Sequence, residues 1–251
     1  MASVTIIIPC YNEAERLQVP RFQAFACARH RLRFLFVNDG STDGTGKVLE
    51  ALQAFDPQRF TIYDLPKNVG KAEAVRQGVL RAFAGGAEYV GYWDADLATP
   101  LEAIPAFCDL LDDRPDLLMV FGARVQLLGR AIERRAVRHY LGRVFATAAS
   151  LVLGIALYDT QCGAKLFRTP SEIQALFHQP FVTRWLFDVE ILARWMHARR
   201  GAARPPIEDI VYEFPLHQWR DVAGSKVKPG DFMKAFLGLA LIYWRYLRPR
   251  V

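Results

Sequence analysis

Two aspartates, Asp94 and Asp96, have the type and spacing that chemistry at a phosphate group requires. They follow the apolar run Tyr89–Trp93, which is typical of a buried strand, so both carboxylates come where that strand stops. Carboxylate oxygens suit Mg²⁺ or Mn²⁺, which commonly bridges to substrate phosphates as well. Such an ion neutralises the charge that grows on a diphosphate leaving group. We therefore predict a metal and diphosphate site at Asp94 and Asp96.

A further carboxylate, Asp39, follows another apolar run. It stands too early in the sequence to cap the helix that is predicted from Thr45, for which Ser41 or Asp43 is available. A carboxylate at this position can accept hydrogen bonds from a nucleobase or a ribose. Asp39 is therefore a candidate ligand of a nucleotide, whereas Ser41 is a candidate for either role.

Parallel βαβ units are the elements that would bring these residues together, because strand patterns alternate with helix patterns. In parallel sheets, ligands bind beyond the carboxyl ends of the strands, so the polar clusters at residues 9–13, 38–41 and 94–96 should share one rim. The fold class expected is α/β, with a Rossmann-like, mostly parallel sheet flanked by helices. The pattern predicts strands over residues 4–8, 33–37, 60–63 and 88–93, and helices over 45–55 and 70–83.

The pattern changes after about Leu101. The elements expected there are a basic helix over 131–143, an apolar run over 144–157, a turn and strand over 159–168, helices over 171–199 with a break at Pro180, a strand over 207–214 and an apolar helix over 231–248.

Composition narrows the class of protein. The 251 residues are 52% hydrophobic and 23% charged, which is ordinary for a globular enzyme and excludes a disordered chain. The net charge of +6 suits an anionic partner, such as nucleic acid, anionic lipid or phosphorylated substrates, although composition alone favours an ordinary solvated surface. Nucleic acid is disfavoured because the arginines are not interleaved with aromatic residues in a recognisable module. The four cysteines form no CxxC pair, so neither a disulfide framework nor a zinc site is indicated, and reduced thiols fit a cytoplasmic setting.

Several longer motifs resemble a known family. VTIIIPCYNEAERL, FVNDGSTDGT, NVGKAEAVRQG and YWDADLATP resemble glycosyltransferase family 2, whose members have the GT-A fold. FGARV, DTQCGAKLFR, RWLFDVEILAR and WRDVAGSKV are similar to the branch that transfers sugars to dolichyl and polyprenyl phosphates, and most of all to its glucose-transferring members. The resemblance extends from about Val4 to Val227.

The resemblance implies a metal-dependent transferase that moves a hexose, with UDP-glucose favoured as donor, onto a dolichyl or polyprenyl phosphate with inversion. It implies a GT-A catalytic domain over residues 1–230, with a nucleotide-sugar half over 1–100 and an acceptor half over 101–230, followed by an apolar helix over 231–251. By matching motifs, it places the nucleobase and ribose at Pro9, Tyr11, Glu13 and Asp39, the diphosphate and metal at Asp94, Ala95 and Asp96, and phosphate-binding cations at Arg124, Arg168 and Lys226.

The chain departs from the family pattern at two positions. Ala98 stands where many relatives carry a glutamine that contacts the metal, so a water or a donor phosphate would take that place. Ala72 stands where a second glycine is usual, but Gly70 still allows close approach to a helix N-terminus, where anions are favoured. Lys71 at that terminus is therefore a candidate donor ligand.

Two carboxylates, Asp159 and Asp188, are candidate bases. A phosphate monoester has a second pKa near ~6, so a lipid phosphate arrives largely ionised and needs no strong base. Asp159 is the first choice because it follows the apolar segment that would bring in the lipid.

Contact with a membrane is expected without a span, since no stretch reaches the roughly 20 apolar residues required and the start of the chain lacks a basic leader. A polybasic helix beside an apolar run favours an anionic membrane surface, here at the cytoplasmic face. Tyr243 and Trp244 suit the headgroup region, although a helix packed on the domain is an equal interpretation. The basic residues concerned are Arg134, Arg135, Arg138 and Arg143.

Other functions stay open at this point. They are a family 2 enzyme that acts on a sugar hydroxyl in polysaccharide assembly, a GDP-mannose-dependent polyprenyl-phosphate mannosyltransferase, and a non-catalytic membrane-bound partner with the GT-A fold. The intact Asp39, Asp94 and Asp96 argue against the last. The nucleobase, the sugar, the lipid length, the oligomeric state and the need for a membrane subunit stay open as well.

Overall fold

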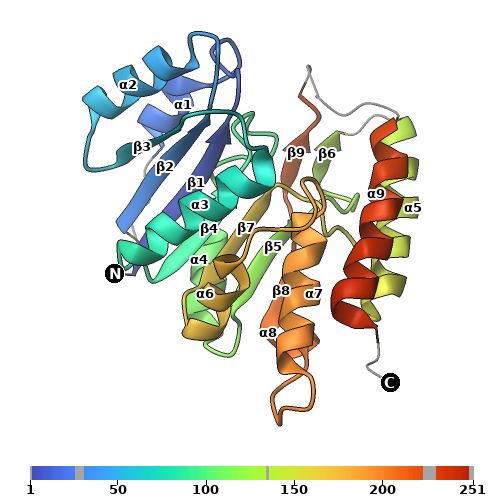
Figure 1. The fold of residues 1–251 in the computed structure, drawn as a ribbon. Coiled ribbons are helices and arrows are strands. Elements are labelled where there is room, and N and C mark those ends of the chain that lie inside the picture. Colours follow the sequence, from blue (N-terminus) through green and yellow to red (C-terminus); the bar gives the residue numbers. More distant parts are fainter. Residues whose placement is uncertain (1, 26–30, 134–135, 223–229, 249–251) are drawn as a thin grey trace.

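A seven-stranded sheet forms the centre of the molecule, in the strand order β3-β2-β1-β4-β7-β5-β8 (Figure 1). The computed structural model describes residues 2–25, 31–133, 136–222 and 230–248. All neighbouring strands are parallel except β7, which runs antiparallel to both β4 and β5. The strands are β1 (Ser3–Cys10), β2 (Arg31–Asp39), β3 (Phe60–Leu65), β4 (Tyr89–Trp93), β5 (Met119–Ala123), β7 (Ala164–Arg168) and β8 (Val211–Pro215).

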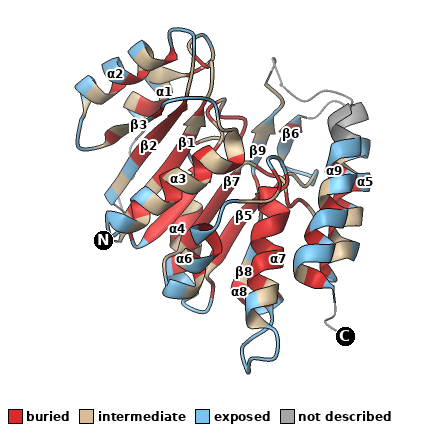
Figure 2. Ribbon diagram, in the orientation of Figure 1, coloured by how far each residue is buried: buried red, intermediate tan, exposed pale blue. Residues whose placement is uncertain are grey.

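Helices cover both faces of the sheet, so the central strands are buried on both sides (Figure 2). Along β1, Ile7 packs in one hydrophobic cluster while Ile6 and Ile8 pack in the other, as the two-residue period of a strand requires. The first cluster includes side chains of α3 (Lys71–Ala84), α6 (Ser171–His178) and α7 (Phe187–Arg199), and the second those of α1 (Val19–Ala24), α2 (Thr45–Phe55) and α4 (Ala103–Asp113).

An outer layer of two helices packs against α7. It consists of α5 (Ala136–Leu153) and α9 (Gly230–Ile242), which lie side by side, and α9 continues as the π-helix η1 (Tyr243–Leu247) (Figure 1). The rings of Phe145 and Phe236 join the two helices at a centroid distance of 6.2 Å. Among the described residues, no helix combines the length and apolarity that crossing a membrane requires.

The first half of the chain follows the sequence prediction, including a helix over Thr45–Phe55, and the mostly parallel α/β class is confirmed. Two predictions in the second half are wrong. Ala131–Glu133 is not helical but forms β6, which pairs with β9 (Gln218–Arg220). This pairing buries Ile132, and the helix α5 begins only at Ala136. The strand expected over 207–214 begins four residues later, because Ile207–Ile210 forms the short helix α8, with acidic residues in its first turn.

Candidate active site

The carboxyl ends of β1, β2 and β4 meet at one rim, as the parallel pairing requires. The turn after β1 is tied to the turn after β2, because the Asn12 backbone N–H donates to Ser41 Oγ at 3.0 Å and the Thr42 N–H donates to Asn12 Oδ1 at 2.9 Å. Asn12 adopts a φ of 50°, which asparagine tolerates better than most residues. The three polar clusters therefore come together as predicted, and Ser41 joins two of them.

Glu13, in the turn after β1, has both carboxylate oxygens engaged by Arg16. Its two carboxylate oxygens accept hydrogen bonds from Arg16 Nε and Nη2, both at 2.8 Å. The pair raises the pKa of Arg16, and the charges of Asp96 and Asp94 raise it further, so Arg16 lies beside the acidic pair. Pro9 is the penultimate residue of β1 and Tyr11 follows that strand, so all three residues matched by resemblance belong to this corner of the rim.

Asp94 and Asp96 lie just beyond β4, separated by the buried Ala95. The side chain of Asp94 is 34% exposed, and Asp96 Oδ1 accepts a hydrogen bond from the Ala98 N–H at 3.1 Å. Burial raises the pKa of Asp96, and the neighbouring negative charge of Asp94 raises it further. Two carboxylates that share a partly buried place are a donor set that a hard divalent cation fits.

A metal at this place would depend on the donor for part of its coordination. Within the described ranges, no group of three or more histidine, cysteine, aspartate or glutamate side chains is arranged to hold a metal ion. Asp94 and Asp96 would therefore provide the protein ligands, and a diphosphate and waters would complete the shell. Magnesium is commonly bound in this manner, through one or two carboxylates and substrate phosphates.

Lys71, the first residue of α3, forms an ion pair with Asp94 Oδ1. Burial alone would lower the pKa of Lys71, but the charges of Asp94, Asp188 and Asp96 raise it above its ordinary value, so the ammonium group stays charged. The sequence-predicted donor ligand thus stands beside the acidic pair.

Asp39 is the residue that positions the loop before Lys71. It is only 3% exposed, and its carboxylate accepts hydrogen bonds from the Val69 N–H at 2.7 Å, the Gly70 N–H at 2.9 Å and Asn68 Nδ2 at 3.0 Å. Burial raises its pKa, whereas the hydrogen bonds from the backbone oppose that rise. Asp39 therefore orients the entry to α3.

Gly163, which precedes β7, presses directly against Asp94, and sequence reasoning did not single it out. The Asp94 backbone N–H donates to the Gly163 carbonyl at 3.0 Å, and a Cβ at position 163 would lie 1.9 Å from Asp94 Oδ2. Only a residue without a side chain fits here while Asp94 keeps its place. The run DTQCG contained the only available signal, as part of the family resemblance.

Asp188, the second candidate base, is held in a buried ion pair. Its Oδ1 lies 2.6 Å from Lys165 Nζ and also accepts a hydrogen bond from the Tyr92 hydroxyl. Lys165 donates in turn to the Cys162 carbonyl at 2.6 Å. Asp188 is therefore engaged by Lys165 and Tyr92, and its role as a base stays a prediction.

Asp159 and Arg124 form a bidentate pair with distances of 2.5 Å from Nε and 2.7 Å from Nη2. The Arg124 backbone N–H also donates to Asp159 at 3.2 Å, and its guanidinium lies 5.1 Å from the ring centroid of Trp219. Burial lowers the pKa of Arg124, but the charges of Asp159 and Asp94 raise it, which places the arginine near the acidic pair. With both oxygens engaged, Asp159 is arranged to orient Arg124.

Arg168 lies at the opposite end of the strands from the rim, so the prediction that it binds phosphate in this site is wrong. Because β7 is antiparallel to β4, Arg168 pairs with Tyr89, the first residue of β4. Its guanidinium donates to the Leu117 carbonyl at 2.9 Å, to the Tyr89 hydroxyl at 3.1 Å and to the Leu111 carbonyl. Its role is therefore structural.

Other predicted cations fall partly outside the structure. Lys226, Arg134 and Arg135 lie outside the described residues, as does the side chain of Arg138. Arg143 is described, and it donates to the Tyr158 carbonyl at 2.8 Å.

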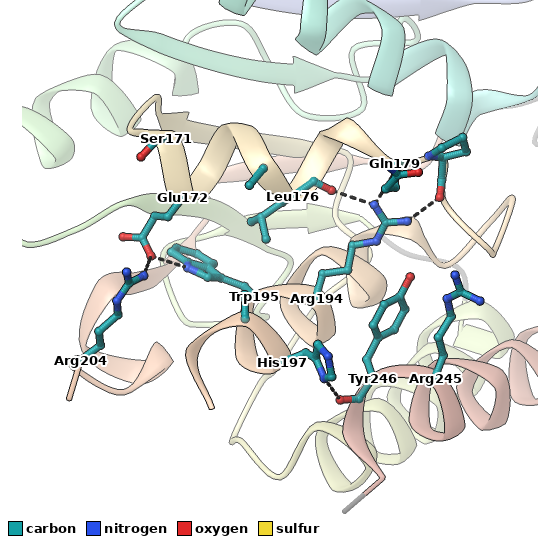
Figure 3. A pocket seen from close by; sticks show the side chains of 13 residues that line it. Ser171, Glu172, Leu176, Gln179, Arg194, Trp195, His197, Arg204, Arg245 and Tyr246 are labelled. Atoms are coloured by element: carbon teal, nitrogen blue, oxygen red, sulfur yellow. Dashed lines mark hydrogen bonds and ion pairs between the residues drawn. The ribbon is translucent and has the colours of Figure 1, made fainter. Parts of the chain in front are cut away.

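A cavity of about 730 Å³ lies away from the rim, between α6, α7 and η1 (Figure 3). Several of its charged side chains bind one another or the backbone, since Arg204 pairs with Glu172 at 3.2 Å and Arg194 donates to the carbonyls of Leu176 and Gln179. This cavity offers no acid–base or metal-binding group near Asp94, so the rim is the better candidate for the active site.

Comparison with known proteins agrees with the geometry. The model of the family "Glycosyl transferase family 2" matches residues 5–173. The chain is 30% identical to human dolichyl-phosphate beta-glucosyltransferase over 97% of this chain and 76% of the relative, and 28% identical to such an enzyme of Trichomonas vaginalis over 96% and 71%.

Solved structures show the same fold. Glucosyl-3-phosphoglycerate synthase from Mycobacterium tuberculosis, crystallised with Mn²⁺, UDP-glucose and phosphoglyceric acid, is similar with a TM-score of 0.66, 15% identity and coverage of 97% of this chain and 80% of that one. A Pyrobaculum calidifontis mannosyltransferase in complex with GDP-Man and Mn²⁺ has a TM-score of 0.58 at 18% identity, over 96% and 62%. From its sequence match and its GT-A architecture, the chain belongs to glycosyl transferase family 2 and is a glycosyltransferase.

Proposed function

We propose that this protein transfers glucose from UDP-glucose to a dolichyl or polyprenyl phosphate, with inversion at the anomeric carbon. The observation that carries the proposal is the rim itself, where Asp94 and Asp96 stand beside the cations of Lys71 and Arg124. Relatives that match nearly the whole chain are dolichyl-phosphate beta-glucosyltransferases, which supports this choice of donor and acceptor.

Donor binding falls to the first half of the chain. Asp94 and Asp96 would hold Mg²⁺ or Mn²⁺, which when bound neutralises charge on the diphosphate. Lys71 would contribute a second positive charge to the same phosphates from the N-terminus of α3, where backbone N–H groups also favour anions. The turn around Tyr11 and the buried Asp39 form the nucleoside end of this site.

Acceptor activation needs little help from a base. An oxygen of the lipid phosphate attacks C1 of glucose from the face opposite to the diphosphate; the C1–O bond to UDP breaks and a C1–O bond to the lipid phosphate forms. The phosphate is largely ionised above pH ~6, so no proton has to be removed at neutral pH. Arg124, held at two points by Asp159, is placed to orient the acceptor phosphate. This arrangement favours a phosphate acceptor over a sugar hydroxyl.

The outer layer is proposed as the membrane contact, with residues 1–230 as the catalytic domain and 231–251 as an interfacial helix on the cytoplasmic side. Figure 2 shows that α5 and α9 turn exposed surface away from the domain. A shallow groove of about 470 Å³ runs between them and is lined by apolar side chains, including Leu151 and Trp244. The exposed large apolar side chains of this layer include Val144, Leu151, Met233, Leu237, Leu241 and Trp244.

Transfer into organic solvent is the test of this function. The purified protein is incubated with a short polyprenyl phosphate, Mg²⁺ and either radiolabelled UDP-glucose or GDP-mannose, and the lipid product is extracted. We expect label from UDP-glucose in the organic phase, loss of transfer with EDTA, and recovery with Mg²⁺ or Mn²⁺.

The same assay on Asp94→Asn/Asp96→Asn protein should show transfer reduced by roughly 10²-fold or more, since electrostatic stabilisation of the leaving group is lost. Label that stays in the aqueous phase with every donor would contradict the lipid acceptor. Full activity in the double variant would contradict the role of the acidic pair.

A further inference from the structure

The segment between α6 and α7, residues 179–186, is held by an unusual number of buried hydrogen bonds. Glu190 on α7 is fully buried, and its carboxylate accepts hydrogen bonds from the Val182 N–H at 3.0 Å, the Thr183 N–H at 3.1 Å and the Thr183 hydroxyl at 3.0 Å. Arg194 pairs with Glu190 at 2.8 Å. Removing one partner from such a buried network is costly, so the path of this segment is well defined.

The start of the segment is fixed by Arg194 as well. Its guanidinium donates to the Gln179 carbonyl at 2.7 Å and to the Pro180 carbonyl at 2.6 Å, in addition to the Leu176 carbonyl at the end of α6 (Figure 3). These three acceptors are backbone carbonyls within residues 176–180, where α6 passes into the segment. Arg194 thus serves the segment and is not a ligand site of its own.

The C-terminal elements support the segment from the other side. The Tyr246 hydroxyl in η1 donates to Glu190 at 3.1 Å. A Cβ at Gly238 of α9 would lie 2.8 Å from the Leu186 side chain, so α9 packs closely against the end of the segment.

This path brings residue 184 to the donor side of the rim. The segment begins where Arg76 of α3 donates to the carbonyls of Phe177 at 3.1 Å and His178 at 3.2 Å, and directly after it the Phe187 ring packs on Tyr92 with a centroid distance of 5.4 Å. The positive charge of Arg184 also acts on Asp39, partly offsetting the effect of burial on the pKa of Asp39. The segment therefore passes the N-terminus of α3.

Arg184 itself is exposed, whereas Thr183, directly before it, and Leu186, two residues after it, are buried. No hydrogen bond or ion pair joins its guanidinium to another residue in the part of the chain that the structure describes. A cation on a fixed backbone beside an anion-binding site, with its donors still available, is arranged to meet a ligand at low entropic cost.

We propose that Arg184 is a donor-binding residue whose guanidinium takes phosphate oxygens of the nucleoside diphosphate. The chemistry is a charge-assisted contact between a planar, forked donor and phosphate oxygens. We assign it to the donor because its charge acts on Asp39, which orients the entry to α3 on the donor side, whereas Arg124 stands with Asp159. The inference rests on the proposed function and adds a residue to its donor site.

Calorimetric titration with UDP and Mg²⁺ tests this assignment. Wild type is compared with Arg184→Gln, with Arg184→Lys, and with Arg31→Gln as the matched control, since Arg31 is an exposed arginine at the start of β2, on the opposite edge of the sheet. The Kd for UDP should rise roughly 10–100-fold in Arg184→Gln. Arg184→Lys should recover part of the loss, and Arg31→Gln should bind like wild type.

Two further measurements distinguish a contact with the donor diphosphate from a contact with the acceptor phosphate. Binding of uridine, followed by ligand-observed NMR, should be unchanged in Arg184→Gln, and the KM for polyprenyl phosphate should stay within about twofold of wild type. UDP binding equal to wild type, or a rise confined to the acceptor KM, would overturn the assignment. A wild-type protein that binds neither UDP nor UDP-glucose would instead remove the proposed function, and the assignment with it.

Discussion

At the scale of single residues, the side chains expected to take part in the reaction are held in position by neighbouring residues. Asp94 is set by the backbone of Gly163, and Arg124 is set by Asp159. In the proposed reaction, Asp159 would contribute through the arginine that it holds, so a carboxylate can matter although no strong base is needed.

Gly163→Ala is predicted to move the Asp94 carboxylate, because the new Cβ would come within 1.9 Å of Oδ2 in the present arrangement. Either Asp94 rotates away or the loop shifts, and a displacement of about 1 Å can cost roughly 10²-fold in rate. Transfer activity should fall by that order while the circular dichroism spectrum stays that of wild type.

Gly46→Ala is the matched control, since its Cβ would meet nothing closer than Asn38 Nδ2 at 3.8 Å and it lies within helix α2. This variant should keep its activity. Gly163→Ala protein with wild-type activity would show that the close packing on Asp94 has no bearing on catalysis.

At the scale of elements, the outer pair α5 and α9 has two distinct sides. Its inner side contributes Phe145, Leu239 and Ile242 to the core, while its outer side leaves Leu151 and Leu237 exposed. Because Gly238 and Tyr246 also support the segment before α7, the layer connects a proposed membrane contact with the donor side of the rim.

Leu237→Glu is predicted to weaken binding to vesicles. The side chain is 65% exposed, so the substitution should not unfold the protein, but it places a charge where the proposed contact buries an apolar group. Burial of a leucine contributes about 1.5–3 kcal/mol, so co-sedimentation with vesicles that contain anionic lipid should weaken by about tenfold or more.

Phe55→Glu provides the control, because Phe55 is 58% exposed at the end of α2, outside the outer layer. It should sediment with vesicles like wild type. Equal weakening by both substitutions would exclude a specific contact through α9.

At the scale of the whole molecule, the candidate site is assembled from both halves of the chain. Asp39, Lys71 and Asp94 come from the first hundred residues, whereas Arg124 and Gly163 come from the second half. Strand β7 makes the connection, since it lies between β4 and β5 in the sheet.

Binding of the nucleotide is therefore predicted to stabilise the fold as one unit. A ligand at 100 times its Kd adds about 2.7 kcal/mol, which for a chain of this size raises Tm by roughly 5–10 °C. Thermal scans with Mg²⁺ and either UDP or GDP should show a single transition, shifted further by UDP. A larger shift with GDP would assign the site to a guanine nucleotide, and no shift with either would contradict a nucleotide site at the rim.

Local pattern alone was enough for much of this protein. Short continuous apolar runs, each followed by polar residues, predict β1, β2 and β4 and the rim that they share, because a buried parallel strand leaves this signature in its own residues. The acidic pair at Asp94 and Asp96 follows from the same pattern.

Tertiary structure alone decided which of the other polar residues reach that rim. The residues of β7 do not by themselves determine its direction, which depends on the strands that it pairs with. Because β7 is antiparallel to β4, Arg168 lies at the opposite end of the strands from the rim, and Gly163 lies against Asp94. In the same way, Asp188 pairs with Lys165, a residue that comes near it only after the chain folds. Long-range pairing of this kind depends on the sum of many contacts across the core, so no local spacing of residues specifies it.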